Sequence, residues 1–283
     1  MSDELPAAPA PVDRARSFGP VAEAYDRGRP SYPAQAVAWL TGGEAKVVLE
    51  LAAGTGKLTR ELVDQGHAVF ATEPDEAMLE VLRERVPEVS AKVATAEEIP
   101  ANDRSVDVVV VAQAFHWFDH EAALAEIARV LKPGGHLALV WNSRDERIPW
   151  VRRMGDILGR QESNTSSSQH LVHSDLFGFV EEATFKHWQE VNRETVLDLA
   201  RSRSSFAAMD DAGRERHLAE LLAFYDDYGR GMDGMQVPYV TRCYRAVVVD
   251  GDEPATSGPD EPSQEGPVVS DGTDTDMLLI DFR

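Results

Sequence analysis

A chain of 283 residues is long enough for one large α/β domain with an elaboration, or for two small domains, and either could bury a sizeable core. Its formal charge of 28 − 49 = −21 repels phosphate backbones and anionic lipid headgroups, so we expect neither nucleic acid nor a membrane as a partner. The single cysteine, Cys243, excludes an intrachain disulfide and a zinc site built on several thiolates.

The first segment, residues 1–12, is rich in Pro and Ala, and we expect it to be disordered. It lacks the order of basic, apolar and small residues that a signal peptide shows. No run in the chain approaches the roughly 20 apolar residues of a membrane span, and VDVVVVAQAF comes nearest. These features predict a soluble, cytoplasmic protein.

Between residues 46 and 141, short and almost wholly apolar runs alternate with stretches of helical periodicity. An apolar run of this kind is typical of a strand that is covered on both faces, as in a parallel sheet. Alternating β and α segments with short connections predict right-handed crossovers and a doubly wound sheet. The expected strands are KVVLEL, AVFAT, VSAKVA, VDVVVVA and HLALVW.

Three helices are expected between these strands. The first covers Lys57–Gln65 and stops at Gly66. Asp75 can cap a second helix, which ends before Pro87. Asp119 can cap a third, HEAALAEIARVLK, which stops at the following PGG.

After residue 141, apolar runs and helical segments no longer alternate regularly. The polar segment QESNTSSSQH is expected to be a loop. Two segments with helical periodicity follow, NRETVLDLARSRS and AGRERHLAELLAFYDDYG. The segment VPYVTRCYRAVVV then reads as a late strand, which we expect to be antiparallel.

This pattern predicts a domain over residues 41–249, in which 142–236 form a helical elaboration that covers the substrate. Residues 250–283 carry ten acids against one Arg and are rich in Gly, Pro, Ser and Thr. That composition is typical of a solvated, disordered tail.

The corner LAAGTGKLT, which joins the first strand to the first helix, does not match two common phosphate-binding fingerprints. A P-loop requires Gly where Leu51 stands, and Ser or Thr where Leu58 stands. A dinucleotide fingerprint accepts Gly54 and Gly56 but requires Gly in place of Thr59. A nucleoside ligand without phosphates remains as a third alternative.

Two acids at strand ends bear on this third alternative. Glu50 closes an apolar strand, where a carboxylate is costly unless backbone N–H groups or a ligand ammonium bind it. The alternative is a solvated charge. Glu73 closes the next strand, 73 − 56 = 17 residues beyond Gly56, where a carboxylate can accept both hydroxyls of a ribose. The alternative for Glu73 is a helix-capping role.

At this point the sequence resembles the class I S-adenosylmethionine-dependent methyltransferases, of the small-molecule type related to ubiquinone and menaquinone methyltransferases. The resemblance implies a Rossmann-like, doubly wound, mostly parallel seven-stranded sheet, with S-adenosylmethionine as cofactor and a small-molecule acceptor. Five motifs carry it, in the order and spacing of the family: VLELAAGTGKLT, VFATEPDEAML, ATAEEIP, SVDVVVVAQAFHWF and RVLKPGGHLALV.

A further motif, SFGPVAEAYDRGRPSYP, is most similar to the branch that includes the fungal trans-aconitate methyltransferases, and this similarity suggests acid substrates. The motif lies within residues 13–40, which we expect to form lid helices. In these helices Tyr25 or Arg29 would contact the carboxylate of the donor or an anionic acceptor. The alternative for both residues is a surface charge and ordinary helix packing.

The resemblance also implies residue roles. The glycines of the corner would let the backbone approach the methionine part of the donor, Glu50 would lie near its ammonium, and Glu73 would hold the ribose. Thr95, Ala96 and Glu97 would frame the adenine. The implied cofactor-binding set is Tyr25, Arg29, Glu50, Ala52, Gly54, Gly56, Thr59, Glu73, Pro74, Met78, Thr95, Ala96 and Gln113. Ala52 departs from the Gly of many relatives, and its methyl group fits if φ is negative there.

Transfer from a sulfonium is an in-line displacement, so the protein mainly aligns two reactants. A carboxylate acceptor needs no base, whereas a phenol, an amine or an activated carbon needs a proton removed. His116 is the histidine placed where such a base could act; the alternative is pocket wall or packing beside Phe115, Trp117 and Phe118, three aromatics of a kind that more often form core than a substrate cage. The remaining histidines lack ligand spacing, so we expect no metal site.

Other functional classes remain open on the sequence. An NAD(P)-dependent oxidoreductase could use the same sheet, although Thr59 and the lack of a Tyr-x-x-x-Lys pair disfavour it. A non-catalytic protein that binds S-adenosylmethionine is a second alternative. A nucleic-acid methyltransferase is the least favoured, because of the net charge and because AQAFHWF replaces the motif of amino-methylating relatives.

Overall fold

The computed structural model describes residues 22–159, 165–228 and 234–249. Contacts within the chain divide it into two units, 1–250 and 251–283. The predicted disordered segment 1–12, the start of the predicted lid before Ala22, and the predicted acidic tail 250–283 lie outside the described residues.

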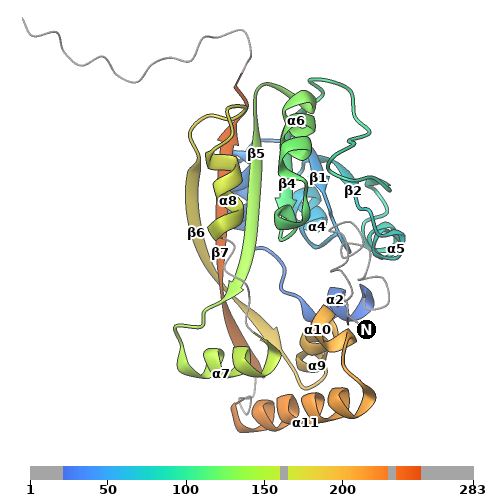
Figure 1. Cartoon of the computed structure of the whole chain (residues 1–283), viewed down its shortest axis with the longest axis vertical. Coiled ribbons are helices and arrows are strands. Elements are labelled where there is room, and N and C mark those ends of the chain that lie inside the picture. Colours follow the sequence, from blue (N-terminus) through green and yellow to red (C-terminus); the bar gives the residue numbers. More distant parts are fainter. Residues whose placement is uncertain (1–21, 160–164, 229–233, 250–283) are drawn as a thin grey trace, which may run out of the picture. The chain divides into compact units, whose positions relative to one another are not determined.

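Seven strands form one sheet in the order β3-β2-β1-β4-β5-β7-β6 (Figure 1). The strands from β3 to β5 are parallel, and β7 is antiparallel to both of its neighbours. The predicted seven-stranded, mostly parallel sheet with a late antiparallel strand is confirmed. The strands are β1 (Val47–Leu51), β2 (Ala68–Thr72), β3 (Ser90–Lys92), β4 (Val106–Ala112), β5 (Leu131–Arg144), β6 (Glu181–Val191) and β7 (Met235–Val247).

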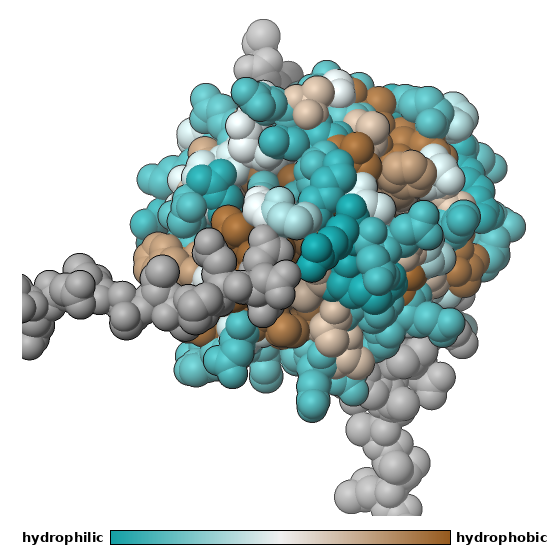
Figure 2. Space-filling model, turned by 90° about the horizontal axis from the view of Figure 1, so that it is seen from above, coloured by the Kyte–Doolittle hydropathy of each residue, from teal (hydrophilic) through white to brown (hydrophobic). Residues whose placement is uncertain are grey.

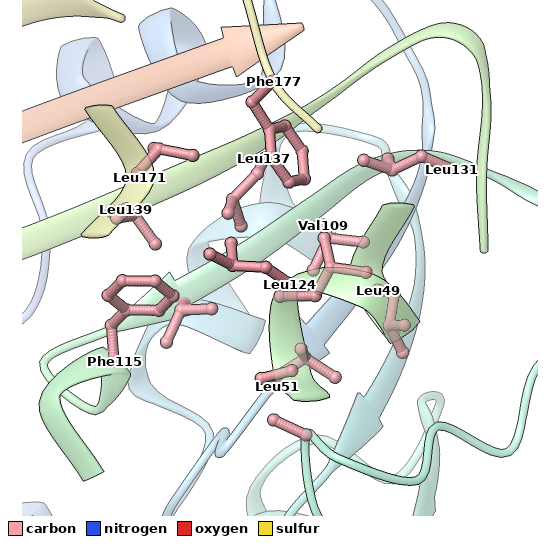
Figure 3. Packing of buried hydrophobic residues seen from close by; sticks show 14 of the residues in the cluster. Leu49, Leu51, Val109, Phe115, Leu124, Leu131, Leu137, Leu139, Leu171 and Phe177 are labelled. Atoms are coloured by element: carbon pink, nitrogen blue, oxygen red, sulfur yellow. The ribbon is translucent and has the colours of Figure 1, made fainter. Parts of the chain in front are cut away.

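Helices cover both faces of the central strands, and successive residues of a strand serve opposite faces. Val109 and Val111 of β4 pack in one core with α6 (His120–Val130), whereas Val108 and Val110 pack in another with α3 (Ala34–Thr41) and α4 (Lys57–Asp64). In Figure 3, Leu124 of α6 lies against Val109 and Leu49. This double cover explains the continuous apolar runs in the sequence.

The predicted caps are present. Asp75 accepts hydrogen bonds from the N–H groups of Ala77 and Met78 at the start of α5 (Glu76–Arg85), and Asp119 accepts one from Ala122 at the start of α6. Strand β2, in contrast, is not covered on both faces, because Phe70 is 48% exposed. This strand lies near the edge of the sheet, where α5 packs on one face only.

The sequence predicted that α6 extends further along the chain than it does. The helix ends at Val130, and β5 begins at Leu131 instead of His136. Leu131 pairs with Val106, and the register then shifts, so that His136 pairs with Val108. Pro133 cannot continue a helix, and the extra residues form a bulge in the long strand.

The segment 142–236 is less helical than predicted, because it contributes strand β6 to the edge of the sheet. Side chains of β6 alternate between exposed and half-buried, and its many charged residues hid the strand from the sequence analysis. Part of the predicted loop QESNTSSSQH forms α8 (Thr165–Val172), with Leu171 in the core. A further helix, α7 (Pro149–Leu158), was not predicted; Pro149 occupies its first turn, where a missing N–H costs nothing.

The two predicted helices of this segment are present as α9 (Thr195–Arg201) and α11 (Asp211–Tyr228), and a short helix that was not predicted, α10 (Ser204–Ala207), lies between them in the chain. With α7 they lie at one end of the sheet, beyond the arrowhead of β5 (Figure 1). They share a separate core with the ends of β6 and β7, which includes Val191, Val237 and Leu221. Short α2 (Ala22–Gly28) packs beside α9.

The face in Figure 2 is mostly hydrophilic, with apolar side chains scattered among charged ones. Such a distribution is normal for a surface in contact with water. Within the described ranges, the helices are too short or too polar to cross a membrane.

Candidate functional site

A cavity of about 380 Å³ lies where β1, β2, β4 and β5 end, between these strands and the segments around α2 and α9. This is the edge at which open α/β sheets bind ligands. Most of the predicted site residues line it: Tyr25, Arg29, Glu50, Ala52, Gly54, Glu73, Pro74, Met78, Thr95, Ala96, Gln113 and His116. Gly56 and Thr59 lie behind the lining.

The corner between β1 and α4 is shaped by its glycines. Gly54 has φ of 59°, and an added Cβ there would find only the Met78 methyl within 4 Å among the described residues, so the backbone faces open space. Gly56 has φ of 85° and precedes α4 directly. An added Cβ at Gly56 would lie 2.9 Å from Leu82, so this glycine allows α5 to pack closely.

Glu73 is 5% exposed and is oriented by two backbone donors. The N–H of Gly54 donates to Oε2 at 2.8 Å, and the N–H of Asp75 donates to Oε1 at 3.0 Å. Burial raises the pKa of Glu73 to about 7, and these two hydrogen bonds oppose the rise. Capping of α5 falls to Asp75, so the carboxylate of Glu73 keeps acceptor capacity toward the cavity.

Glu50 is 1% exposed, so it is not a solvated charge at a strand end. The hydroxyl of Thr59 donates to Oε2 of Glu50 at 2.6 Å, which gives the Thr at the third fingerprint position a role behind the cavity wall. Burial raises the pKa of Glu50 to about 8, and the nearby Glu73 contributes to the rise. Two buried acids that face one cavity favour a cationic ligand.

Two neighbouring strands leave the sheet through strained residues. Ala52 follows β1 with φ of 53°, and Gln113 follows β4 with φ of 63°. The condition under which the methyl group of Ala52 would fit without cost, a negative φ, is not met: this turn needs the left-handed conformation, and Ala adopts it at a cost of about 1–2 kcal/mol. Both residues line the cavity, and strain of this kind concentrates at functional sites.

The segment after β4 places one of its aromatic side chains in the core and the others at the cavity. Phe115 is fully buried in the core shared with α6, as the packing alternative predicted. His116, Trp117 and Phe118, from the short 3₁₀ helix η2 (Phe115–Trp117) and the residue after it, line the cavity. The rings of His116 and Trp117 are 4.6 Å apart. His116 is thus placed to contact a ligand.

Three guanidinium groups and a phenol that line the same cavity lie close enough together for their charges to interact. We call Arg29, Arg144, Arg203 and Tyr239 the basic end. Arg144 donates to Glu146 at 3.2 Å and to the carbonyl of Gly159 at 3.1 Å.

Helix α2 packs against α9 and is held there by hydrogen bonds, so it is not an isolated helix on the surface. Arg27 donates to the fully buried Asp198 at 2.8 Å, and Nε of Arg29 donates to the hydroxyl of Ser202 at 3.0 Å. A Cβ on Gly28 would lie 2.5 Å from the carbonyl carbon of Asp198. In contrast, α3 is a core helix, with Val37 and Leu40 fully buried, so among residues 22–40 the prediction of a lid rests on α2 and not on α3.

Comparison with known proteins places this geometry in a family. Residues 49–139 match the family described as "Methyltransferase domain". An uncharacterised methyltransferase of Mycobacterium tuberculosis is 44% identical over 239 residues, which cover 83% of this chain and 97% of the relative. The chain belongs to the class I S-adenosylmethionine-dependent methyltransferases. An uncharacterised methyltransferase-like protein of Schizosaccharomyces pombe is 34% identical over 82% of this methyltransferase and 93% of its own length.

Solved structures show the same fold. A candidate methyltransferase of an antibiotic biosynthesis pathway in Anabaena variabilis superposes with a TM-score of 0.55 at 23% identity, over 74% of this methyltransferase and 95% of the other chain. A phosphoethanolamine N-methyltransferase of Haemonchus contortus, in complex with S-adenosylhomocysteine, gives 0.52 at 17% identity, over 86% and 61% of the two chains.

The sequence analysis missed the basic end of this methyltransferase, apart from Arg29. Arg144 comes three residues after the predicted strand HLALVW, and Tyr239 lies near the start of an antiparallel strand. Both positions fall at the carboxyl edge of the parallel strands, which is a signal that topology alone could have supplied. No local pattern marks Arg203, since its position depends on how α9 packs.

Proposed function

We propose that this methyltransferase transfers the methyl group of S-adenosylmethionine to a small carboxylic acid. The observation that carries the donor is the pair of buried acids, Glu50 and Glu73, beside the open backbone of Gly54. A donor with an ammonium, a sulfonium and a ribose diol supplies both the cations and the hydroxyl donors that two such carboxylates lack.

The residues fit this donor. Glu73 holds the ribose diol, because its two oxygens are already oriented by Gly54 and Asp75. Glu50 faces the ammonium, and Gly54 leaves room for the methionine part. Thr95 and Ala96 frame the adenine, and Pro74 and Met78 pack on its face.

S-adenosylmethionine supplies an activated methyl group on a sulfonium, so the chain has to align an acceptor with it. Positioning of this kind can contribute about 7–11 kcal/mol to lowering a barrier. Gln113, held by its side-chain hydrogen bond to the carbonyl of Asn142 at 3.2 Å, orients the cavity wall next to the methionine part. His116 contacts the acceptor and takes up a proton only where the acceptor has one to lose.

A carboxylic acid is the acceptor that places least demand on these residues, because an ionised carboxylate oxygen can attack without a base. Its support is the segment with Tyr25 and Arg29, which resembles acid-methylating relatives and lines the same cavity as the corner. In this proposal α2 acts as the lid, with Arg29 stacked over the ring of Tyr25 at 5.3 Å.

The test compares ligands by their effect on thermal stability. S-adenosylmethionine or S-adenosylhomocysteine, at about 100 times its dissociation constant, should raise the free energy of unfolding by about 2.7 kcal/mol, whereas NAD and NADP should not. In calorimetric titration, Glu73→Ala should lose donor affinity. Transfer of a labelled methyl group to acids, phenols and quinols then identifies the acceptor; transfer to phenols but not to acids would contradict the acid.

A further inference from the structure

Three polar side chains from neighbouring strands adjoin one another at the edge of the cavity. Asn142 of β5 is buried and pairs directly with Thr241 of β7, which is fully buried. Strand β6 adds His187, whose Nδ1 lies 3.1 Å from the hydroxyl of Thr241. Asn142 lines the cavity, whereas Thr241 and His187 lie behind the lining. Buried polar groups cost free energy unless they are hydrogen-bonded, so each of these side chains needs partners.

The directions of these hydrogen bonds follow from the donors and acceptors that are present. Nδ2 of Asn142 donates to the carbonyl of Ser31 at 2.9 Å, and Oδ1 of the same amide accepts from the hydroxyl of Thr241 at 2.6 Å. A hydroxyl has one proton to donate, so Thr241 can only accept from His187. Nδ1 of His187 must therefore carry the proton of the neutral ring. Burial lowers the pKa of His187, which favours the neutral ring.

Ser31 lies in the connection between α2 and α3, and it is held from two sides. Its carbonyl accepts from the amide of Asn142, and its hydroxyl donates to Oε1 of Glu61 on α4 at 2.6 Å. The next residue, Tyr32, is buried and lines the cavity. The two anchors of Ser31 therefore fix the point from which the side chain of Tyr32 extends along the cavity wall.

Tyr32 meets Gln113 at this wall. Burial, with Tyr25 and Glu50 nearby, raises the pKa of Tyr32 well above its ordinary value, and a side-chain hydrogen bond with Gln113 opposes the rise. Gln113 has φ of 63°, and a residue keeps so strained a conformation only where its surroundings fix it from several directions. The phenol of Tyr32 and the carbonyl of Asn142, which accepts from Nε2 of Gln113 at 3.2 Å, supply two of these contacts.

We propose that Thr241 and Asn142 are positioning residues of the donor site. Thr241 orients the amide of Asn142, and the amide holds Ser31. The anchored connection then sets Tyr32 against Gln113, on the wall that the donor contacts. The inference rests on the proposed function, which assigns this wall to the methionine part of the donor. Because Thr241 lies behind the lining, it acts on binding through Asn142.

The alternative is a network that only stabilises the sheet. Loss of a hydrogen bond in such a network lowers the free energy of unfolding and leaves the affinity of the folded protein for a ligand unchanged. Loss of a positioning contact lowers that affinity as well, since part of the binding free energy is then spent on ordering the wall. Ligand affinity therefore separates the two roles.

The experiment measures the affinity of the full chain for S-adenosylhomocysteine by calorimetry. Thr241→Val keeps the shape of the side chain and removes its hydroxyl, and Thr241→Ser keeps the hydroxyl. Asn142→Ala and the double variant with Thr241→Val complete a cycle. Thr41→Val is the matched control, because Thr41 is also fully buried and its hydroxyl donates to carbonyls of its own helix, α3. Circular dichroism and the unfolding midpoint establish that each variant is folded.

Thr241→Val should weaken binding roughly 5- to 20-fold, Thr241→Ser less than about 2-fold, and Thr41→Val not at all. In the Asn142→Ala background, Thr241→Val should have no further effect, because the two residues act in series. Nitrogen-15 NMR of the wild type should show the proton of His187 on Nδ1, with the signals assigned by their loss in His187→Phe. This measurement tests the direction of the network even if a Thr241 variant does not fold.

Three results would overturn the inference. In the first, folded Thr241→Val binds S-adenosylhomocysteine like the wild type. In the second, Thr241→Val weakens binding by the same factor in the Asn142→Ala background as in the wild type. In the third, the proton of His187 is on Nε2, so that the hydroxyl of Thr241 donates to His187 and not to Asn142. Failure of the wild type to bind S-adenosylhomocysteine would instead contradict the proposed function.

Discussion

Glu50→Gln should stabilise the enzyme without ligand at high pH, although it removes a residue of the proposed donor site. The side chain is 1% exposed, and its folded-state pKa is about 8, compared with an ordinary value of 4.5. Gln resembles the protonated acid in shape, and its carbonyl can accept the hydrogen bond that the Thr59 hydroxyl donates. The substitution therefore removes the titration and little else.

The magnitude follows from linkage. Because the folded state holds this proton more tightly than the unfolded state does, the stability contributed by Glu50 is lost as pH rises from about 4.5 to about 8. A shift of this size corresponds to about 5 kcal/mol, at roughly 1.4 kcal/mol per pKa unit. Glu50→Gln should match the wild type near pH 5 and exceed its free energy of unfolding by several kcal/mol at pH 9.

Urea unfolding followed by circular dichroism at pH 5, 7 and 9 measures this difference. Glu80→Gln, at an exposed position of α5, is the control and should stay within about 0.5 kcal/mol of the wild type at each pH. The reasoning is refuted if the difference between Glu50→Gln and the wild type is the same at pH 5 and pH 9.

Three further outcomes are expected. Donor affinity should rise from pH 6 to pH 9, because Glu50, with a pKa of about 8, must ionise to bind the ammonium, and Glu73, with a pKa of about 7, must ionise to accept hydrogen bonds from both ribose hydroxyls; titrations in buffers of different ionisation enthalpy should detect released protons, and a pH-independent affinity would be inconsistent with this. Ala52→Gly should raise the free energy of unfolding by up to about 1 kcal/mol in urea, since relief of left-handed strain exceeds the entropy cost of Gly; a loss would argue against strain. Gly28→Ala should cost about 1–3 kcal/mol and raise KM, because its Cβ would overlap the backbone of Asp198; unchanged kinetics would remove α2 from the site.

Much of the sheet could be predicted from the sequence because its signals are local. The continuous apolar run at β4 reports cover on two faces, and Asp75 precedes its helix directly. Strand β6 was missed for the converse reason: at the edge of the sheet it keeps charged, exposed side chains, so its pattern resembles that of a surface segment. The bulge in β5 depends on pairing with β4, which no single segment reveals.

Within the candidate site, the sequence by itself determined the glycine corner, Glu50 and Glu73, because strand ends and turns place them within one stretch of chain. The depth of burial of the two acids, the positive φ of Ala52 and the meeting of Arg29, Arg144 and Arg203 were decided only by the tertiary structure. These three arginines are separated by more than fifty residues at each step along the chain. The three arginines come close to one another only because α2, β5 and α9 pack around one cavity. Packing between segments that are distant in the chain has no periodic signal in the sequence, so it could not be predicted.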